Sequence, residues 1–196
     1  MRTGGDDIAQ MLALIGAKPL WEKASGRVTG FTVIPLAELG RPRIDVTLKI
    51  SGMFRDAFPA QLDLIDSAVR AIAALAEDDA ANPIAAAARQ SRKALIEKGV
   101  SADLADRAAA ARVFGARPGT YGSGMQVMVD EGIWESRADF AGAFIEWGGF
   151  AYGGGSEGEA AAEMLSERLR SVDAVLHNQD NREHDLLDSD DYYQFE

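Results

Sequence analysis

The stretch RIDVTLKIS, residues 43–51, alternates strictly between apolar and polar side chains and decides the fold class of the chain. Its apolar residues share one face of a predicted strand: Ile44, Val46, Leu48 and Ile50. From Pro59 the apolar residues recur at three and four positions instead, at Leu62, Ile65, Val69, Ile72 and Ala76. A period of two is typical of a half-buried strand, and a period near 3.6 of an amphipathic helix. A strand followed directly by a helix predicts a mixed α/β fold.

Upstream of this stretch, GRVTGFTVIP (residues 26–35) is rich in β-branched and aromatic residues and predicts a second strand. A short helix is expected before it, capped by Asp6 or Asp7, running to Ile15 and stopped by Gly16. Between the two strands, Gly40 and Pro42 break the linker PLAELGRPR.

Downstream, Asn82 and Pro83 form a helix-start signal, and the helix is expected to end at Gly99. Four further helices are predicted. One starts at Ser101 and one, in GSGMQVMVDEG, ends at Gly132. The third runs from Ser136 to Gly148, and the fourth covers the amphipathic residues 157–170. ARVFG (111–115) predicts a short strand, and VDAVLHNQD (172–180) a last one. The fold class is therefore mixed α/β with a small sheet. Residues 1–196 are expected to form a single segment.

Composition limits the classes of function. The chain is 47% hydrophobic and 26% charged, as is usual for a globular domain. Its net charge of −11 argues against a nucleic-acid partner held through phosphates. It has no cysteine, which excludes disulfides, zinc–thiolate sites and iron–sulfur clusters. We expect a cytoplasmic location, because the N-terminus does not resemble a secretory signal and no stretch has the length of a membrane span.

The glycine-rich stretch GGFAYGGGSEGE, residues 148–159, resembles a phosphate-binding loop at first sight. It has no Lys–Ser/Thr pair to reach the terminal phosphates, and no strong strand pattern precedes it. A flexible connection between two helices is the better interpretation.

Four residues are candidates for binding a substrate. Arg41 and Arg43 lie in GRPR, and Arg55 lies in SGMFRDAFP between the predicted strand and helix. An arginine fork suits bidentate contact with a carboxylate, but the better interpretation of Arg55 with Asp56 is an ion pair that fixes the turn, and a structural role is likewise favoured for Arg41 and Arg43. Tyr121, among glycines in RVFGARPGTYGSGM (112–125), offers a ring to pack on a flat ligand, or else forms part of a tight structural loop.

The last residues, DNREHDLLDSDDYYQFE (180–196), hold the candidate metal ligands His184, Asp188 and Asp190. Carboxylates with one imidazole suit a borderline divalent metal. Histidine titrates near neutral pH, so His184 with Asp185 is also the candidate catalytic pair. The segment has no glycine and does not fit an EF-hand loop. A solvated acidic face is the alternative.

Four segments together resemble the large subunit of the cobalt chelatase of aerobic cobalamin synthesis, in a family that includes the magnesium chelatase large subunit. They are TGGDDIAQ (3–10), VIPLAELGRPRIDVTLKISGMFRDAFPAQLDLIDSAV (33–69), RVFGARPGTYGSGMQ (112–126) and NQDNREHDLLDSDDYYQFE (178–196). The last is similar to the cobalt branch. Because the large subunits of the family are far longer, the resemblance implies a segment of a multidomain chain that is truncated at its C-terminal end.

The resemblance implies insertion of Co²⁺, the substrate metal, into hydrogenobyrinic acid a,c-diamide. ATP would be bound by an AAA+ ATPase subunit and its companion, and not by this chain. The isolated segment would then be inactive. Two alternatives stay open: a scaffold segment that docks the ATPase subunits without a metal role, and a magnesium chelatase homologue.

Overall fold

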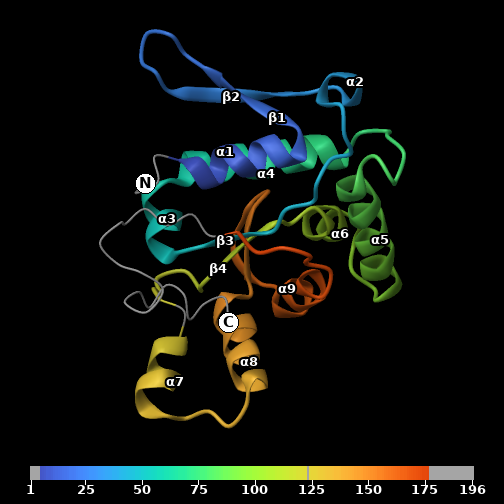
Figure 1. Cartoon of the computed structure of the whole chain (residues 1–196). Coiled ribbons are helices and arrows are strands. Elements are labelled where there is room, and N and C mark those ends of the chain that lie inside the picture. Colours follow the sequence, from blue (N-terminus) through green and yellow to red (C-terminus); the bar gives the residue numbers. More distant parts are fainter. Residues whose placement is uncertain (1–4, 123, 177–196) are drawn as a thin grey trace.

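The computed structural model describes residues 5–122 and 124–176, with the Gln126 side chain excepted. Within them a four-stranded sheet lies between two groups of helices, and a two-stranded hairpin runs above one group (Figure 1). The chain therefore has the mixed α/β architecture predicted from its sequence.

The central sheet has the strand order β3 (Leu48–Ile50), β4 (Val113–Gly115), β5 (Phe150–Gly153) and β6 (Ser156–Ala160). β3 and β4 are parallel, with Leu48 opposite Val113, whereas β4, β5 and β6 pair antiparallel. The parallel pair needs a long crossover, and the helices between residues 52 and 109 supply it. The carboxyl ends of β3 and β4 consequently share one edge of the sheet.

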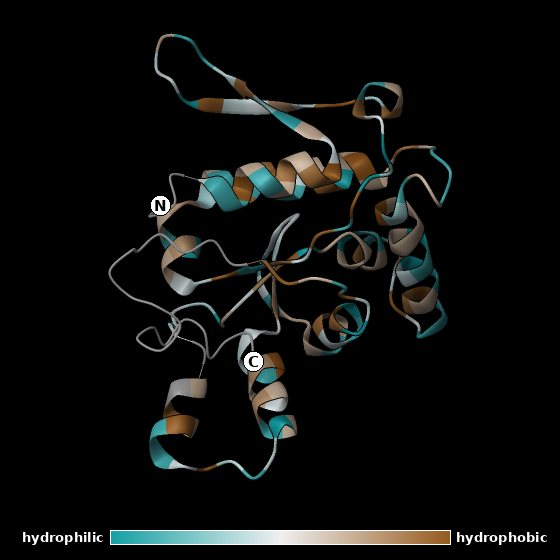
Figure 2. Ribbon diagram, in the orientation of Figure 1, coloured by the Kyte–Doolittle hydropathy of each residue, from teal (hydrophilic) through white to brown (hydrophobic). Residues whose placement is uncertain are grey.

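Alternation along the strands sends side chains into two cores. On one face Ile50, Val113 and Tyr152 pack against α1 (Asp6–Ile15) and α4 (Pro59–Ala73). On the other face Phe114 and Ala151 pack with residues of α8 (Arg137–Gly148) and α9 (Ala162–Leu169). Figure 2 shows hydrophobic and hydrophilic residues alternating around α1 and α4, as amphipathic helices require.

The hairpin pairs β1 (Ala17–Trp21) with β2 (Val28–Val33) and lies along α1 and α4 (Figure 1). α2 (Leu36–Leu39) then leads back toward the sheet. The crossover contains α3 (Gly52–Ala57), α4, α5 (Pro83–Glu97) and α6 (Ala102–Ala109), and α7 (Met125–Glu131) precedes α8. Among the described helices, none is long and apolar enough to cross a lipid bilayer.

Most helix boundaries confirm the sequence signals. Gly16 ends α1 in the left-handed conformation, Asn82 accepts a hydrogen bond from the Ala85 amide at the start of α5, and Ser136 forms a capping box with Asp139. The predicted aspartate cap of α1 is wrong, because Gly5 occupies the N-cap and both aspartates lie in the first turn.

Several strand predictions are wrong. Residues 44–47 alternate as expected but pair with no strand, so β3 is only Leu48–Ile50. Residues 157–160 belong to β6, and the glycine-rich stretch forms the β5–β6 hairpin instead of a flexible link between helices. Residues 172–176 form no strand, and the rest of that prediction lies outside the described residues.

Candidate functional site

The carboxyl ends of β3 and β4 bring together segments more than sixty residues apart in the sequence. After β3, Ser51 caps α3 by accepting a hydrogen bond from the Phe54 amide at 3.1 Å. Gly52 then lies directly against the loop after β4: a Cβ at this position would be 2.5 Å from the Thr120 carbonyl oxygen and 2.9 Å from the Tyr121 ring. Ligands often bind at such an edge of an α/β sheet.

Arg55 is the centre of this edge and is buried. It donates to both Asp56 carboxylate oxygens, at 2.6 and 2.9 Å. Its third nitrogen reaches the main-chain carbonyls of Ala116, Arg117 and Thr120. Arg55 thus fixes the loop after β4 to α3, which agrees with the ion-pair interpretation of its role.

The Tyr121 hydroxyl donates to Asp56 at 2.6 Å, and its ring lies with its centroid 5.7 Å from the Arg55 guanidinium carbon. Hydrogen bonds from Arg55 and Tyr121 lower the pKa of Asp56 to about 2. The hydrogen bond and the negative charge of Asp56 raise the pKa of Tyr121 above its usual value. Tyr121 is 59% exposed, so its ring remains available to a ligand. The sequence proposed Arg55 and Tyr121 separately, and the structure brings them together.

Arg117 is a candidate that the sequence reasoning missed. It lies on the loop after β4, its guanidinium stacks 5.5 Å from the centroid of the Phe150 ring, and its side chain is exposed. Within residues 5–122 and 124–176 its guanidinium makes no hydrogen bond or ion pair, so it is free to meet a carboxylate. The only sequence signal was a basic residue inside the glycine-rich loop. We call Arg55, Asp56, Arg117 and Tyr121 the carboxyl-edge cluster.

Arg43 does not belong to the carboxyl-edge cluster, and its hydrogen-bond donors are all bound within the protein. It is 1% exposed and donates to the two carboxylate oxygens of Glu77, at 2.7 and 2.9 Å. Its remaining N–H groups reach three main-chain carbonyls, those of Ile15, Gly16 and Ile34. The hydrogen bonds from Arg43 lower the pKa of Glu77. These contacts leave no donor for a substrate, so they favour a structural role over the predicted substrate contact.

Arg41 donates to the last carbonyls of α1, those of Ala13 and Leu14, at 2.7 and 3.0 Å. A cation at this end of a helix satisfies orphan carbonyls and complements the helix dipole. Arg41 therefore holds α1 to the segment before β3, and it does not lie with the carboxyl-edge cluster.

Asp45, the next charged residue of the RPRID stretch, is bound by two arginines. Arg112 donates to both of its oxygens at 2.7 and 3.0 Å, and Arg168 donates at 3.0 Å and also to Thr47 at 2.7 Å. Burial and the neighbouring Arg112 lower the pKa of Arg168 to about 10. This ion-pair network ties the segments that precede β3 and β4 to α9.

Lys49 is a second residue that sequence reasoning missed. Its ammonium lies 5.4 Å from the centroid of the Phe144 ring and packs against Gly148 at the end of α8. Burial lowers the pKa of Lys49 to about 8. Because Lys49 alternates with Leu48 and Ile50, the sequence pattern put its side chain on the polar face of the strand. In the structure α8 covers that face.

The predicted metal ligands and catalytic pair, His184, Asp185, Asp188 and Asp190, lie outside the described residues. Within residues 5–122 and 124–176, no three histidine, aspartate or glutamate side chains gather to hold a metal ion.

Comparison with known proteins bears on the family. A family model described as CobN/Magnesium Chelatase matches residues 1–196. The chain is 61% identical over its whole length to an aerobic cobaltochelatase subunit CobN from a Sinorhizobium species, of which it spans 15%. It is 34% identical to a magnesium-chelatase subunit from Chlorobaculum parvum, of which it spans 14%.

A solved structure is similar over nearly the whole chain. The catalytic subunit of cobaltochelatase from Mycobacterium tuberculosis matches with a TM-score of 0.88 and 44% identity, over 97% of this chain and 16% of that one. The fold described above is thus the fold of one part of a much longer subunit. The chain belongs to the CobN/magnesium chelatase family.

Proposed function

We propose that the chain is part of the large, tetrapyrrole-binding subunit of an ATP-dependent cobaltochelatase, which inserts Co²⁺ into hydrogenobyrinic acid a,c-diamide in cobalamin biosynthesis. The observation that carries this proposal is the 61% identity to a cobaltochelatase subunit over the whole chain, against 34% and 36% for two magnesium-chelatase subunits. An AAA+ ATPase subunit and its companion bind ATP in this proposal, and the complex is cytoplasmic. The chain alone, about 15% of a subunit, is inactive.

The carboxyl-edge cluster is the part of the described structure best suited to a flat, carboxylated macrocycle. The Arg117 guanidinium makes no hydrogen bond or ion pair within the described residues, and such a group can bind a carboxylate through two hydrogen bonds. The exposed ring of Tyr121 offers a flat apolar surface beside it. Arg55 acts as a positioning residue, because its contacts with Asp56 and with the loop carbonyls hold Tyr121 in place.

Metal insertion also needs a base for the inner N–H protons of the macrocycle and a ligand set for Co²⁺. Asp56 is a weak base, because its pKa is about 2, although it stays ionised and can accept a hydrogen bond. We assign the base to His184 with Asp185 when the imidazole holds no metal, and the metal ligands to His184, Asp188 and Asp190 when it does. Imidazole and carboxylates suit Co²⁺ and release it more readily than thiolates would.

The function is tested in the full-length subunit together with its ATPase partners. Metal insertion is measured with cobalt and hydrogenobyrinic acid a,c-diamide, and in parallel with magnesium and protoporphyrin. We expect turnover only with the first pair. Turnover only with the second would place the chain in the magnesium branch.

The site residues are tested by substitution in the same subunit. Arg117→Ala should weaken macrocycle binding, measured by the change in macrocycle absorbance, about tenfold for the loss of one charged contact. Tyr121→Ala should also weaken it, because it removes the ring surface. Arg89→Ala, at an exposed ion pair with Asp79, is the matched control and should leave binding unchanged. Unchanged affinity in Arg117→Ala would remove this residue from the site.

The metal ligands need a separate experiment, calorimetric titration of the 196-residue chain with Co²⁺. Binding should disappear in the double variant His184→Ala, Asp188→Ala. If the wild-type chain binds no cobalt, or the variant binds it equally well, the assignment of the acidic segment is wrong.

An interaction role has one observation in its favour. α8 is apolar around most of its surface, yet only Gly148 among its residues is buried. At the preceding turn Ile133 and Trp134 are 62% and 48% exposed. Such a helix normally lies inside a larger core, so the α7–α8 hairpin is a candidate contact with another part of the chelatase.

A further inference from the structure

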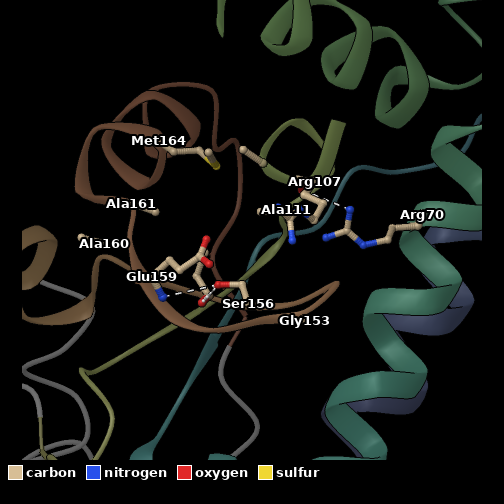
Figure 3. Close-up of a pocket in the computed structure, with 11 residues that line it drawn as sticks. Arg70, Arg107, Ala111, Gly153, Ser156, Glu159, Ala160, Ala161 and Met164 are labelled. Atoms are coloured by element: carbon tan, nitrogen blue, oxygen red, sulfur yellow. Dashed lines mark hydrogen bonds between the residues drawn. The ribbon is translucent and has the colours of Figure 1, made fainter. Parts of the chain in front are cut away.

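A small pocket lies at the end of the central sheet opposite the carboxyl-edge cluster. The β5–β6 turn meets α4, α6 and α9 there and encloses about 80 Å³ (Figure 3). Ligand sites for whole small molecules usually measure several hundred cubic ångströms. This pocket therefore has room for one functional group and not for a cofactor.

One side of the pocket carries hydrogen-bond donors. Arg70 is held from behind by Asp66 at 2.7 Å and donates to the Arg107 carbonyl at 3.1 Å, which leaves N–H groups on both terminal nitrogens. The Arg107 guanidinium makes no hydrogen bond or ion pair with the part of the chain that the structure describes. Figure 3 shows Arg70 and Arg107 side by side at the pocket. Two guanidinium groups so placed repel one another unless acceptor oxygens lie between them.

The opposite side carries an acceptor. Figure 3 shows Glu159, on β6, across the pocket from Arg107. Its backbone amide bonds to Ser156, but its carboxylate has no partner within the described residues. The remaining wall is built of small and apolar side chains, including Ala108, Ala111 and Met164. The pocket thus has the hydrogen-bond donors of Arg70 and Arg107 on one side, the acceptor Glu159 on the other, and apolar side chains between them.

The glycine turn fixes this arrangement. Gly154 has φ +62°, and a Cβ there would lie 2.1 Å from the Arg70 Nη2 atom, so the turn backbone packs flat against the guanidinium. Gly153 has φ +95°, and a Cβ there would lie 2.5 Å from the Asp66 carboxyl carbon. Both positions therefore require glycine, because φ is positive there and because a side chain would clash with Arg70 or Asp66. The turn holds Arg70 at the pocket wall, with Asp66 behind it.

We propose that this pocket binds the primary carboxamide group of a small molecule. The charges of Arg70 and Arg107 are balanced by Glu159 at the pocket and by Asp66, which binds Arg70 behind the pocket wall. A bound carboxylate would add a negative charge facing Glu159, and a bound amine would face the arginines. A carboxamide adds no charge, because its carbonyl oxygen accepts from Arg70 and Arg107 while its NH₂ donates to Glu159. The apolar wall accommodates the carbon chain that carries the amide.

The test is a titration of the ¹⁵N-labelled 196-residue chain, followed by amide and arginine side-chain NMR signals. Three probes of nearly equal shape are compared: propionamide, propionate and propylamine. We expect propionamide to shift the signals of Gly153–Gly155 and Arg107 saturably and at lower concentration than propionate, and propylamine to cause no shift. Tighter binding of propionate would overturn the proposal in favour of an anion site, and no saturable shift with propionamide would remove it altogether.

Two exposed residues give the deciding variants. Glu159→Ala should weaken propionamide binding about tenfold while strengthening that of propionate, and Arg107→Ala should weaken both. Glu157→Ala, on the same strand but not at the pocket, is the control for Glu159→Ala and should bind as the wild type does. Equal propionamide affinity in Glu159→Ala and the wild type would contradict the proposed geometry. The result is independent of cobalt insertion, because none of these residues belongs to the carboxyl-edge cluster.

Discussion

At the scale of single residues, the arginines of this chain divide by what their donors already bind. Arg43 gives its hydrogen bonds to Glu77 and to carbonyls of two other segments, and is 1% exposed. Arg117 gives none to described residues and is exposed. Both residues look alike in the sequence. Only the three-dimensional contacts separate a structural guanidinium from an available one.

Arg43→Ala should destabilise the chain by about 3–5 kcal/mol, because it leaves the half-buried Glu77 carboxylate and several carbonyls without partners. Urea denaturation followed by circular dichroism measures the difference. Arg92→Ala, which removes an exposed pair with Asp106, is the control and should cost less than about 1 kcal/mol. Equal losses in the two variants would mean that burial of Arg43 contributes nothing.

Asp56 gives a prediction about pH. Its pKa is lowered from 3.8 to about 2 by hydrogen bonds from Arg55 and Tyr121, so these contacts stabilise the fold above pH 3.8 and the gain is lost as the pH falls toward 2. Tyr121→Phe removes one of these bonds and should raise the pKa of Asp56 toward 3.8, as measured by NMR titration of the carboxyl carbon. Asp139, whose pKa is lowered by the backbone amides of Glu135 and Ser136, is the internal control. Its midpoint should not move, and an unmoved Asp56 would contradict the Tyr121 contact.

At the scale of elements, the sequence predicted helices better than it predicted strands. The apolar period of α4 and the caps of α5 and α8 are local signals, and each marked a helix that the structure contains. Strand β6, with the sequence SEGEA, has no strand pattern. It pairs because the glycines at positions 154 and 155 make a two-residue turn in the left-handed conformation that hairpins favour. A strand that is held by its pairing with another segment need not show a strand pattern in its own sequence.

The contact between α3 and the loop after β4 is predicted to depend on the missing Cβ of Gly52. Gly52→Ala places a methyl group 2.5 Å from the Thr120 carbonyl oxygen and should cost about 1–3 kcal/mol. Gly142→Ala, within α8 and with nothing within 4 Å, is the matched helical control and should stabilise by about 0.5–1 kcal/mol. Thermal unfolding of both variants tests this. A neutral Gly52→Ala would show that the loop moves away freely.

At the scale of the whole molecule, the candidate site arises from topology. Arg55 and Tyr121 were each recognisable as candidates, but their meeting requires β3 and β4 to pair in parallel. Sequence patterns indicated both strands and carried no information on which strands are neighbours. Lys49 was placed on a polar face because alternation marks two faces without saying whether a helix covers the second one.

The whole-molecule view also explains why apolar side chains remain exposed on α7 and α8. The chain spans about 15% of the length of its curated relatives, and the α7–α8 hairpin projects from the body in Figure 1. We therefore expect Ile133→Asp with Trp134→Ala to destabilise the 196-residue chain by less than about 2 kcal/mol, because Ile133 is largely solvated and Trp134 is half exposed and loses mainly its ring contact with Phe140. In the full-length subunit the same double variant should reduce metal insertion, measured with the ATPase partners present. Leu104→Asp on α6, 46% exposed, is the control and should leave insertion unchanged. If the double variant inserts metal as the wild type does, the exposed hairpin is not a contact surface, and the apolar character of α8 must serve its packing on Lys49 and Phe114 alone.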